Sequence, residues 1–233
     1  MDHTTRTKKD ISFKDMIKGD WPICLIIAGS LIVGLFLYPR LPNSVPIHWG
    51  ANGKANGFAS RTFAVLFEPL LNTALYFVLI GAPFIDPERK NFANFLGAYR
   101  MFRLFFHSFL SAIYIVSLLI GLGYRFDMAM AVNMGLGFMF IVIGLLMGSF
   151  RHNYTIGIRV PWTLASPLVW DKTHKFAGSI WIGAGIVTVL GAFAGSPAGL
   201  IIMLISLGIA SIIPVIYSYL SYRKLMENKD AVR

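Results

Sequence analysis

Residues 153–174, NYTIGIRVPWTLASPLVWDKTH, form the longest polar segment between strongly apolar ones in the C-terminal half of the chain. The segment concentrates Arg, Pro, Trp and His side chains in a protein whose remaining length is mostly compatible with lipid. The apolar stretches on both sides are long enough to cross a bilayer, so the segment is predicted to be a loop between two membrane spans. We expect it to carry much of any specific function.

The composition predicts an all-α, polytopic membrane protein. Charged residues make up 14% of the 233 residues and apolar residues 56%, whereas about a quarter of the residues in a soluble domain are charged. Six apolar runs are each long enough to cross a hydrocarbon core of roughly 30 Å as a helix. They cover residues 20–38, 63–84, 104–124, 128–150, 176–194 and 199–220.

These spans divide the chain into six parts. The predicted parts are an N-terminal segment 1–19, two spans in 20–84 with an outer loop 39–61, two spans in 85–150, an inner loop 151–175, two spans in 176–220, and a tail 221–233. Gly144 and Gly148 in the fourth span, and Gly191 and Gly195 in the fifth, have GxxxG spacing. This spacing predicts close helix packing within the chain, with homodimerisation as the alternative, so the oligomeric state is left open.

The distribution of basic residues predicts that both termini are cytoplasmic, because cytoplasmic loops carry an excess of Lys and Arg. In that orientation 17 of the 21 basic residues lie on the inner side, and Arg40, Lys54, Arg61 and Arg125 lie outside. The net charge of +10 therefore indicates topology and attraction to anionic membrane lipids. Nucleic-acid binding is not expected, because the basic residues are spread over four separate segments.

The ends of the chain and its single cysteine suggest no special chemistry. Residues 1–19 are expected to be an ordered lead-in to the first span. If they form a short interfacial helix, Ile11, Phe13, Met16, Ile17 and Trp21 would lie along one side. Cys24 lies inside the first span, so there is neither a disulfide framework nor a thiolate cluster.

The outer loop 39–61 contains two Asn-Gly pairs, Asn52-Gly53 and Asn56-Gly57. Such pairs supply the positive backbone angles of tight turns, so a small hairpin or compact loop is predicted. Pro46 precedes His48 and Trp49, which would project near the membrane surface. We interpret the loop as a lid over the outer helix ends, with ligand recognition as the alternative.

Glu68 lies well inside the second predicted span, where an ionisable group indicates a functional site. Asn72 is one turn deeper on the same face, and Asn133 enters the fourth span from the outer side. These three side chains are predicted to form an outer polar pocket, with His48 or Arg61 above it. His107 is expected close to the cytoplasmic surface and far from Glu68, because the third span is taken to begin near Arg103.

In the inner loop, Ser166 and Pro167 are typical of a helix start, with Ser as N-cap and Pro in the first turn. The helix is predicted to continue through Trp170 and His174 into the fifth span. Its N-terminus, next to Arg159, would suit an anion such as a lipid phosphate or a carboxylate. The alternative is that Arg159 reaches lipid headgroups and the tryptophans anchor the loop at the interface.

Two motifs stand out, one in the inner loop and one in the outer loop. The inner one comprises Asn153, Ile156-Gly157-Ile158-Arg159, Pro161-Trp162-Thr163-Leu164 and Trp170. The outer one comprises Leu41-Pro42, Val45-Pro46, His48-Trp49 and Gly53. These motifs resemble those of a known family, the SdpI-type bacterial immunity proteins. They occur in the order and the six-helix frame of that family, so the resemblance covers nearly the whole chain. Glu68 and His174 are not part of the family's signature.

The resemblance implies a multi-pass protein of the bacterial cytoplasmic membrane that protects a cell from a secreted, membrane-active peptide toxin. In the best-known system the immunity protein also holds a cytoplasmic repressor at the membrane. The expected partners are therefore membrane lipids, a peptide toxin outside and a repressor inside.

The other function classes are a transporter and a membrane enzyme. A small secondary transporter is the alternative, because Glu68, Asn72 and Asn133 are polar groups in the outer half, although no internal repeat is evident. A membrane enzyme is not expected, because no nucleophile and base occur together at a suitable spacing. No cofactor or metal is predicted, since ligand-spaced Cys and His clusters are missing from the sequence.

Overall fold

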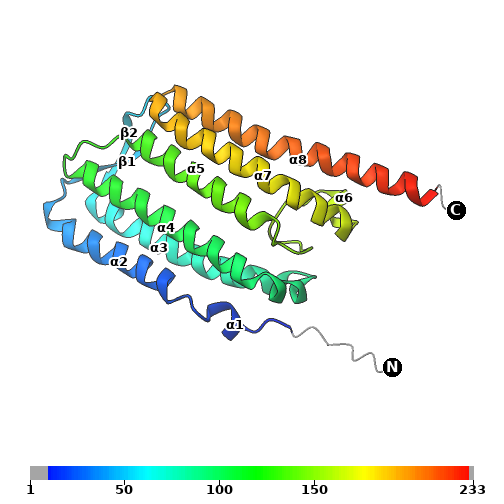
Figure 1. Cartoon of the computed structure of the whole chain (residues 1–233). Helices are drawn as coiled ribbons and strands as arrows, with labels where there is room; N and C mark the ends of the chain where they lie inside the picture. The colour runs from blue at the N-terminus through cyan, green and yellow to red at the C-terminus, as the bar shows by residue number, and fades with distance from the viewer. Residues whose placement is uncertain (1–9, 231–233) are drawn as a thin grey trace.

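Six long helices run side by side in the computed structural model, which describes residues 10–230 (Figure 1). All six are long and apolar enough to cross a membrane, which confirms the predicted number of membrane-length helices in a mostly helical chain. The helices are α2 (Trp21–Leu37), α3 (Arg61–Gly81), α4 (Leu96–Gly121), α5 (Met128–Met147), α7 (Pro167–Gly191) and α8 (Ala198–Asp230). Arg6, Lys8, Lys9 and Arg233, which entered the topology prediction, lie outside the described residues.

Two helices begin earlier than their predicted apolar runs. The helix over the fifth span begins at Pro167, with the Ser166 hydroxyl accepting from the Val169 N–H, as the helix-start pattern predicted. The third membrane span was predicted to begin near Arg103, but the corresponding helix, α4, begins at Leu96. The prediction was wrong because Arg103 was taken to mark the membrane surface, whereas its side chain is fully buried within the bundle.

The bundle consists of two three-helix halves. Helices α2, α3 and α4 contact one another in the first half, and α7 packs between α5 and α8 in the second. The contact of α4 with α5 joins the halves. Short helices complete the chain: α1 (Phe13–Ile17), η1 (Tyr38–Arg40), η2 (Ala82–Ile85), η3 (Arg89–Asn94), α6 (Pro161–Leu164) and η4 (Ala192–Ala194).

Helices α5 and α7 approach each other closely at glycines. A Cβ atom on Gly144 would lie 2.7 Å from the carbonyl oxygen of Gly178, and one on Gly137 would lie 2.9 Å from that of Gly185. The predicted GxxxG contacts are therefore only partly correct, since Gly144 is in the interface but Gly148 meets only the flexible side chain of Lys175. Backbones come this close only where neither side chain intervenes.

A two-stranded antiparallel hairpin caps one end of the bundle (Figure 1). Its strands are β1 (Ser44–Trp49) and β2 (Ala55–Ser60), and the turn between them includes Gly53 with φ +74°. The predicted hairpin is thus present with its turn at Asn52-Gly53, whereas Asn56-Gly57 lies within β2 and Gly57 has no positive φ. It packs against α3 and α4, whereas α1 and the C-terminal end of α8 lie at the opposite end of the bundle (Figure 1).

A buried aromatic cluster fills the end of the bundle that faces away from the hairpin. Met16 of α1 is fully buried there, so residues 10–20 fold onto the helices. The buried members of the cluster are Ile11, Met16, Ile80, Phe92, Phe95, Tyr99, Met147, Phe150 and Ala177. This cluster holds the connection from α3 to α4 against the start of the inner loop, and so positions the first candidate site.

Candidate functional site

The part of the inner loop before α7, residues 151–166, is called the motif loop below. Asn153 is fully buried at its start and organises the backbone around it. Its side-chain oxygen accepts from the N–H groups of Thr155 and Ile156, both at 2.8 Å, and its amide donates to the Arg151 carbonyl at 2.7 Å. Asn153 therefore uses its hydrogen-bonding groups to shape the loop, as Asn does in many turns.

Trp170 and His174 of α7 fix the motif loop from the helix side. The Trp170 indole N–H donates to the Phe150 carbonyl at 2.8 Å. The Trp170 and His174 rings stack with their centroids 4.0 Å apart. His174 Nδ1 donates to the Trp170 carbonyl at 2.8 Å, while its Nε2 accepts from the Ile158 N–H at 3.0 Å. These two partners assign a neutral imidazole with the proton on Nδ1, because a carbonyl can only accept and a backbone N–H can only donate.

Gly157 lies directly against this pair of rings. Its φ is +118°, and an added Cβ would lie 2.5 Å from His174 Nε2. Thr163 has a comparable structural role, because its buried hydroxyl donates to the Ile158 carbonyl at 2.8 Å and accepts from the Val160 N–H at 3.0 Å. Glycine and threonine at these positions let the loop close onto α7.

The exposed residues of the motif loop are a different set. Arg159 is exposed, and its guanidinium donates to the Tyr154 carbonyl at 2.5 Å. Pro161 is also exposed, and the half-buried Trp162 donates from its indole N–H to the Ser218 hydroxyl of α8. The predicted inner site thus divides into a buried framework and an outward-facing group, in which Arg159 carries the positive charge.

The connection between α3 and α4 braces the motif loop through a residue that sequence reasoning missed. Asp86 is almost fully buried, and its Oδ2 accepts from the Tyr154 N–H at 2.8 Å and from the Thr155 hydroxyl at 2.6 Å. Nearby, Asn91 donates to the His152 carbonyl at 2.8 Å. Asp86 precedes a proline in an ordinary polar segment, so no local pattern pointed to this role.

On the hairpin side, the structure brings Glu68 and Asn72 together as predicted and adds His107. Asn72 is fully buried and donates to Glu68 Oε1 at 3.0 Å and to the Ser111 hydroxyl at 3.1 Å. The oxygen of Asn72 lies 2.5 Å from His107 Nδ1. The expected separation of His107 from Glu68 was wrong, because α4 begins earlier than predicted and carries His107 into the middle of the bundle.

The other members of the predicted outer pocket lie elsewhere. Glu68 lines a cavity of about 290 Å³ under the hairpin. Asn133 lines a different cavity of about 160 Å³, together with Trp49, Gly50, Met128 and Leu200 among others. His48 is exposed and its Nδ1 lies 2.6 Å from the Asn56 side-chain oxygen.

The hairpin side of the bundle also carries three other predicted residues, Arg61, Pro46 and Trp49. The Arg61 guanidinium lies over the Tyr38 ring, 5.1 Å from its centroid. Pro46 is buried in β1, and its carbonyl accepts from the Ser117 hydroxyl at 3.1 Å. Trp49 lines both the cavity of Glu68 and the cavity of Asn133, so the predicted single pocket is two cavities that share one tryptophan.

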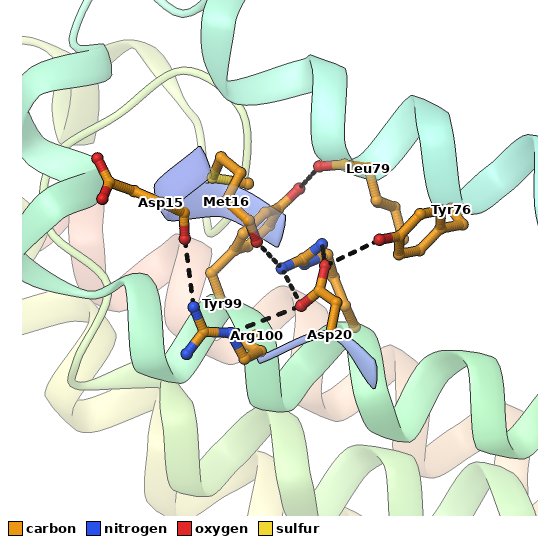
Figure 2. A network of polar contacts seen from close by, with 8 residues as sticks. Asp15, Met16, Asp20, Tyr76, Leu79, Tyr99 and Arg100 are labelled. Carbon is orange, nitrogen blue, oxygen red and sulfur yellow. Dashed lines mark hydrogen bonds and ion pairs between the residues drawn. The ribbon is translucent and has the colours of Figure 1, made fainter. Parts of the chain in front are cut away.

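A buried ion-pair network lies at the other end of α3 and α4 (Figure 2). Asp20, which immediately precedes α2, is 2% exposed and receives hydrogen bonds from both terminal nitrogens of Arg103, at 2.8 and 3.0 Å. Tyr76 of α3 donates to the same carboxylate at 3.2 Å, and Arg100 lies 3.5 Å away. Figure 2 shows Asp20 between Tyr76 and Arg100, with Met16 of α1 beside them.

The polar groups therefore follow the contact between α3 and α4. Glu68, Asn72 and Tyr76 are four residues apart on α3, and Arg103, His107 and Ser111 are four residues apart on α4, so each set lies on one helix face. The Tyr76 ring meets the His107 ring edge-on at 5.8 Å between centroids, which brings the Glu68 group next to the Asp20 network. Within residues 10–230, no group of three or more His, Cys, Asp or Glu side chains is placed to hold a metal ion.

Six membrane-length helices, a hairpin at one end and a tightly bonded motif loop at the other define a multi-pass membrane protein with specialised structure at both ends. Residues 149–218 match the SdpI/YfhL protein family, and residues 25–73 match a domain of unknown function, DUF1648. The first match covers the motif loop, α7 and part of α8, and the second covers most of α2, the hairpin and part of α3.

The chain is similar to the Immunity protein SdpI of Bacillus subtilis (strain 168). The two sequences are 29% identical over 202 residues, which cover 86% of this chain and 94% of the relative. These matches confirm the resemblance to SdpI-type proteins that the two motifs predicted. No solved structure matches the chain.

Proposed function

We propose that this chain is an immunity protein of the bacterial cytoplasmic membrane that protects its cell against a secreted, membrane-active peptide. The observation that carries the proposal is the similarity to a protein named for immunity over 86% of the chain. A binding role also suits the site, because its buried polar side chains are largely used to hold the motif loop and the helices together.

The charge distribution supports an orientation with the motif loop in the cytoplasm and the hairpin outside. In this orientation the hairpin and its cavities meet a peptide that arrives from outside. The exposed Arg159 then faces anionic lipid headgroups or an acidic group of a cytoplasmic repressor. The proposal thus includes a signalling role, in which the protein binds a repressor on the cytoplasmic side in addition to giving immunity.

A survival assay tests the immunity proposal. Cells sensitive to a membrane-active killing peptide would be challenged with and without this protein, and with the Arg159→Ala and Arg159→Lys variants at equal membrane abundance. We expect the native protein to protect and Arg159→Ala to lose protection, while Arg159→Lys, which keeps the charge, retains part of it. Arg159 is exposed, so its replacement should leave the fold intact. A properly inserted native protein that gave no protection would refute the proposal.

A small secondary transporter is the second candidate, and the observation that favours it is the continuous contact from Glu68 through Asn72 to His107. Ionisable groups inside a bundle commonly line ion pathways. Vesicles containing the purified protein would show ion-linked or proton-linked flux that Glu68→Gln abolishes. Tight vesicles with no such flux would eliminate this candidate.

A further inference from the structure

A cavity of about 290 Å³ lies under the hairpin, between β1 and the halves of α3 and α4 that face it. Its walls are largely aromatic and aliphatic, and they include Trp49, Phe63 and Phe67. The Phe63 and Phe67 rings stack with centroids 4.7 Å apart. This volume is at the small end of the range for ligand pockets, so the cavity suits one side chain or chain terminus.

Four of the lining residues carry polar side-chain atoms, and the hydroxyl groups of two of them already donate hydrogen bonds within the protein. The Tyr114 hydroxyl donates to the Val65 carbonyl at 2.9 Å, and the Ser117 hydroxyl donates to the Pro46 carbonyl at 3.1 Å. The third is Trp49, whose indole N–H can only donate, and the fourth is Glu68, whose Oε2 is buried and has no hydrogen-bond partner. Glu68 is therefore the lining residue with an unused acceptor for a donor group of a ligand.

The bundle holds Glu68 in place without neutralising it. Its Oε1 accepts from Asn72, whose own oxygen is engaged by His107. The ion pairs among residues 10–230 use other carboxylates, and the two arginines nearest along α3 and α4 are engaged elsewhere, Arg61 over Tyr38 and Arg103 with Asp20. A carboxylate among aromatic rings at membrane depth is costly unless an opposite charge meets it.

We propose that this cavity binds a primary ammonium group of a hydrophobic peptide, either its amino terminus or a lysine, with Glu68 as the counter-ion. The rings of Trp49, Phe63 and Phe67 form the walls, because aromatic faces attract cations and the apolar flanks of the ligand alike. The inference rests on the proposed function, since it takes the secreted peptide as the occupant. It adds the chemistry by which that peptide is recognised.

Binding to the full-length protein in nanodiscs tests this site directly. The discs would contain phosphatidylcholine and phosphatidylglycerol, neither of which carries a primary ammonium group. The probes are a short amidated leucine peptide with a free amino terminus and the same peptide acetylated at its amino terminus. Calorimetric titration should show that the native protein binds the free-amine peptide at least about tenfold more tightly, as expected for a desolvated charge pair.

Three variants make the test specific. Glu68→Gln keeps an acceptor for the Asn72 amide and should remove the preference for the free amine. Ile47→Trp, at an exposed position on the cavity wall, should block both peptides while leaving Glu68 in place. Glu227→Gln, at an exposed carboxylate of α8, is the matched control and should bind as the native protein does. Helix content by circular dichroism should be equal in all four proteins.

Equal affinity for the two peptides, or an unchanged preference in Glu68→Gln, would overturn the proposal. Discs made with phosphatidylethanolamine provide a further arm, because competition by that lipid would assign the site to a headgroup and overturn the peptide assignment. The binding result does not depend on cell survival. A Glu68-dependent preference without protection would therefore refute the immunity function alone, and protection without that preference would refute this site alone.

Discussion

Arg103 on α4 donates from both terminal nitrogens to the two carboxylate oxygens of Asp20, although 83 residues separate them in the chain. Both side chains are at most 2% exposed. Arg103 also donates to the Met16 carbonyl at 3.0 Å, so one guanidinium connects α4 to the start of α2 and to α1. This arrangement makes Met16 and Asp20, just before α2, an integral part of the bundle.

Removing one partner of this pair should be strongly destabilising. Asp20→Ala would leave a buried guanidinium without its counter-ion, and such a change typically costs about 3–5 kcal/mol. Reversible unfolding in mixed micelles, followed by circular dichroism, would measure the loss. The double replacement Asp20→Leu with Arg103→Met should recover most of it, because both charges are then removed together.

The exposed ion pair between Arg223 and Glu227 offers the control for that experiment. Glu227→Ala should change stability by less than about 1 kcal/mol, as is usual for a surface pair. A loss in Asp20→Ala no larger than in this control would contradict the structural importance of the buried pair.

Gly157→Ala should open the motif loop. The residue has φ +118° and its Cβ would lie 2.5 Å from His174 Nε2, so the substitution combines backbone strain with a steric clash. Gly123→Ala separates the two effects, because Gly123 has φ +93° and nothing within 4 Å of an added Cβ. Strain alone costs about 1–3 kcal/mol, so Gly157→Ala should lower the free energy of unfolding by more than Gly123→Ala does. Equal losses would show that the ring contact is unimportant.

His174→Phe should keep the ring stacked on Trp170 but leave the Ile158 N–H without an acceptor. A buried donor that loses its partner costs about 1–3 kcal/mol. Hydrogen–deuterium exchange should increase at Ile158 and its neighbours in the motif loop. The exposed Lys172 of the same helix provides the control Lys172→Met, which should exchange as the native protein does. Unchanged protection of Ile158 in His174→Phe would mean that another acceptor replaces the imidazole.

Gly144→Ala should force α5 and α7 apart, because the new methyl group would lie 2.7 Å from the Gly178 carbonyl oxygen. Overpacking of this kind costs about 1–3 kcal/mol. Gly183→Ala on α7 has nothing within 4 Å and should be neutral or slightly stabilising, since Ala favours helix more than Gly does. If both variants unfold at the same midpoint, the close approach of the helices does not limit stability.

The sequence was sufficient for the elements that depend on local patterns. Apolar runs predicted six helices because a bilayer requires about 20 apolar residues per span. Asn52-Gly53 predicted the hairpin, and Ser166-Pro167 predicted the start of α7. Each of these signals lies within the segment that it describes, so no knowledge of tertiary contacts was needed.

The misplaced features depend on partners that are distant in the chain. Arg103 indicates a membrane surface only if it is exposed, and it is buried because Asp20 neutralises it. That single error moved the predicted start of α4 and so separated His107 from Glu68. The glycine contacts of α5 and α7 were only partly predicted for the same reason, because GxxxG spacing describes one helix while the contact depends on the register of two.

The glycine contact between α5 and α7 also determines how the motif loop can be studied. Gly144 and Gly178 hold the two helices together near the loop, so the two ends of the loop are a fixed distance apart. Two hydrogen bonds then anchor the loop to α7, one from Trp170 to the Phe150 carbonyl and one from the Ile158 N–H to His174. A synthetic peptide that copies only residues 151–166 would lack both anchors, and its backbone groups would hydrate instead. Partner-binding experiments therefore require the loop attached to its helices, in a detergent or bilayer that keeps them paired.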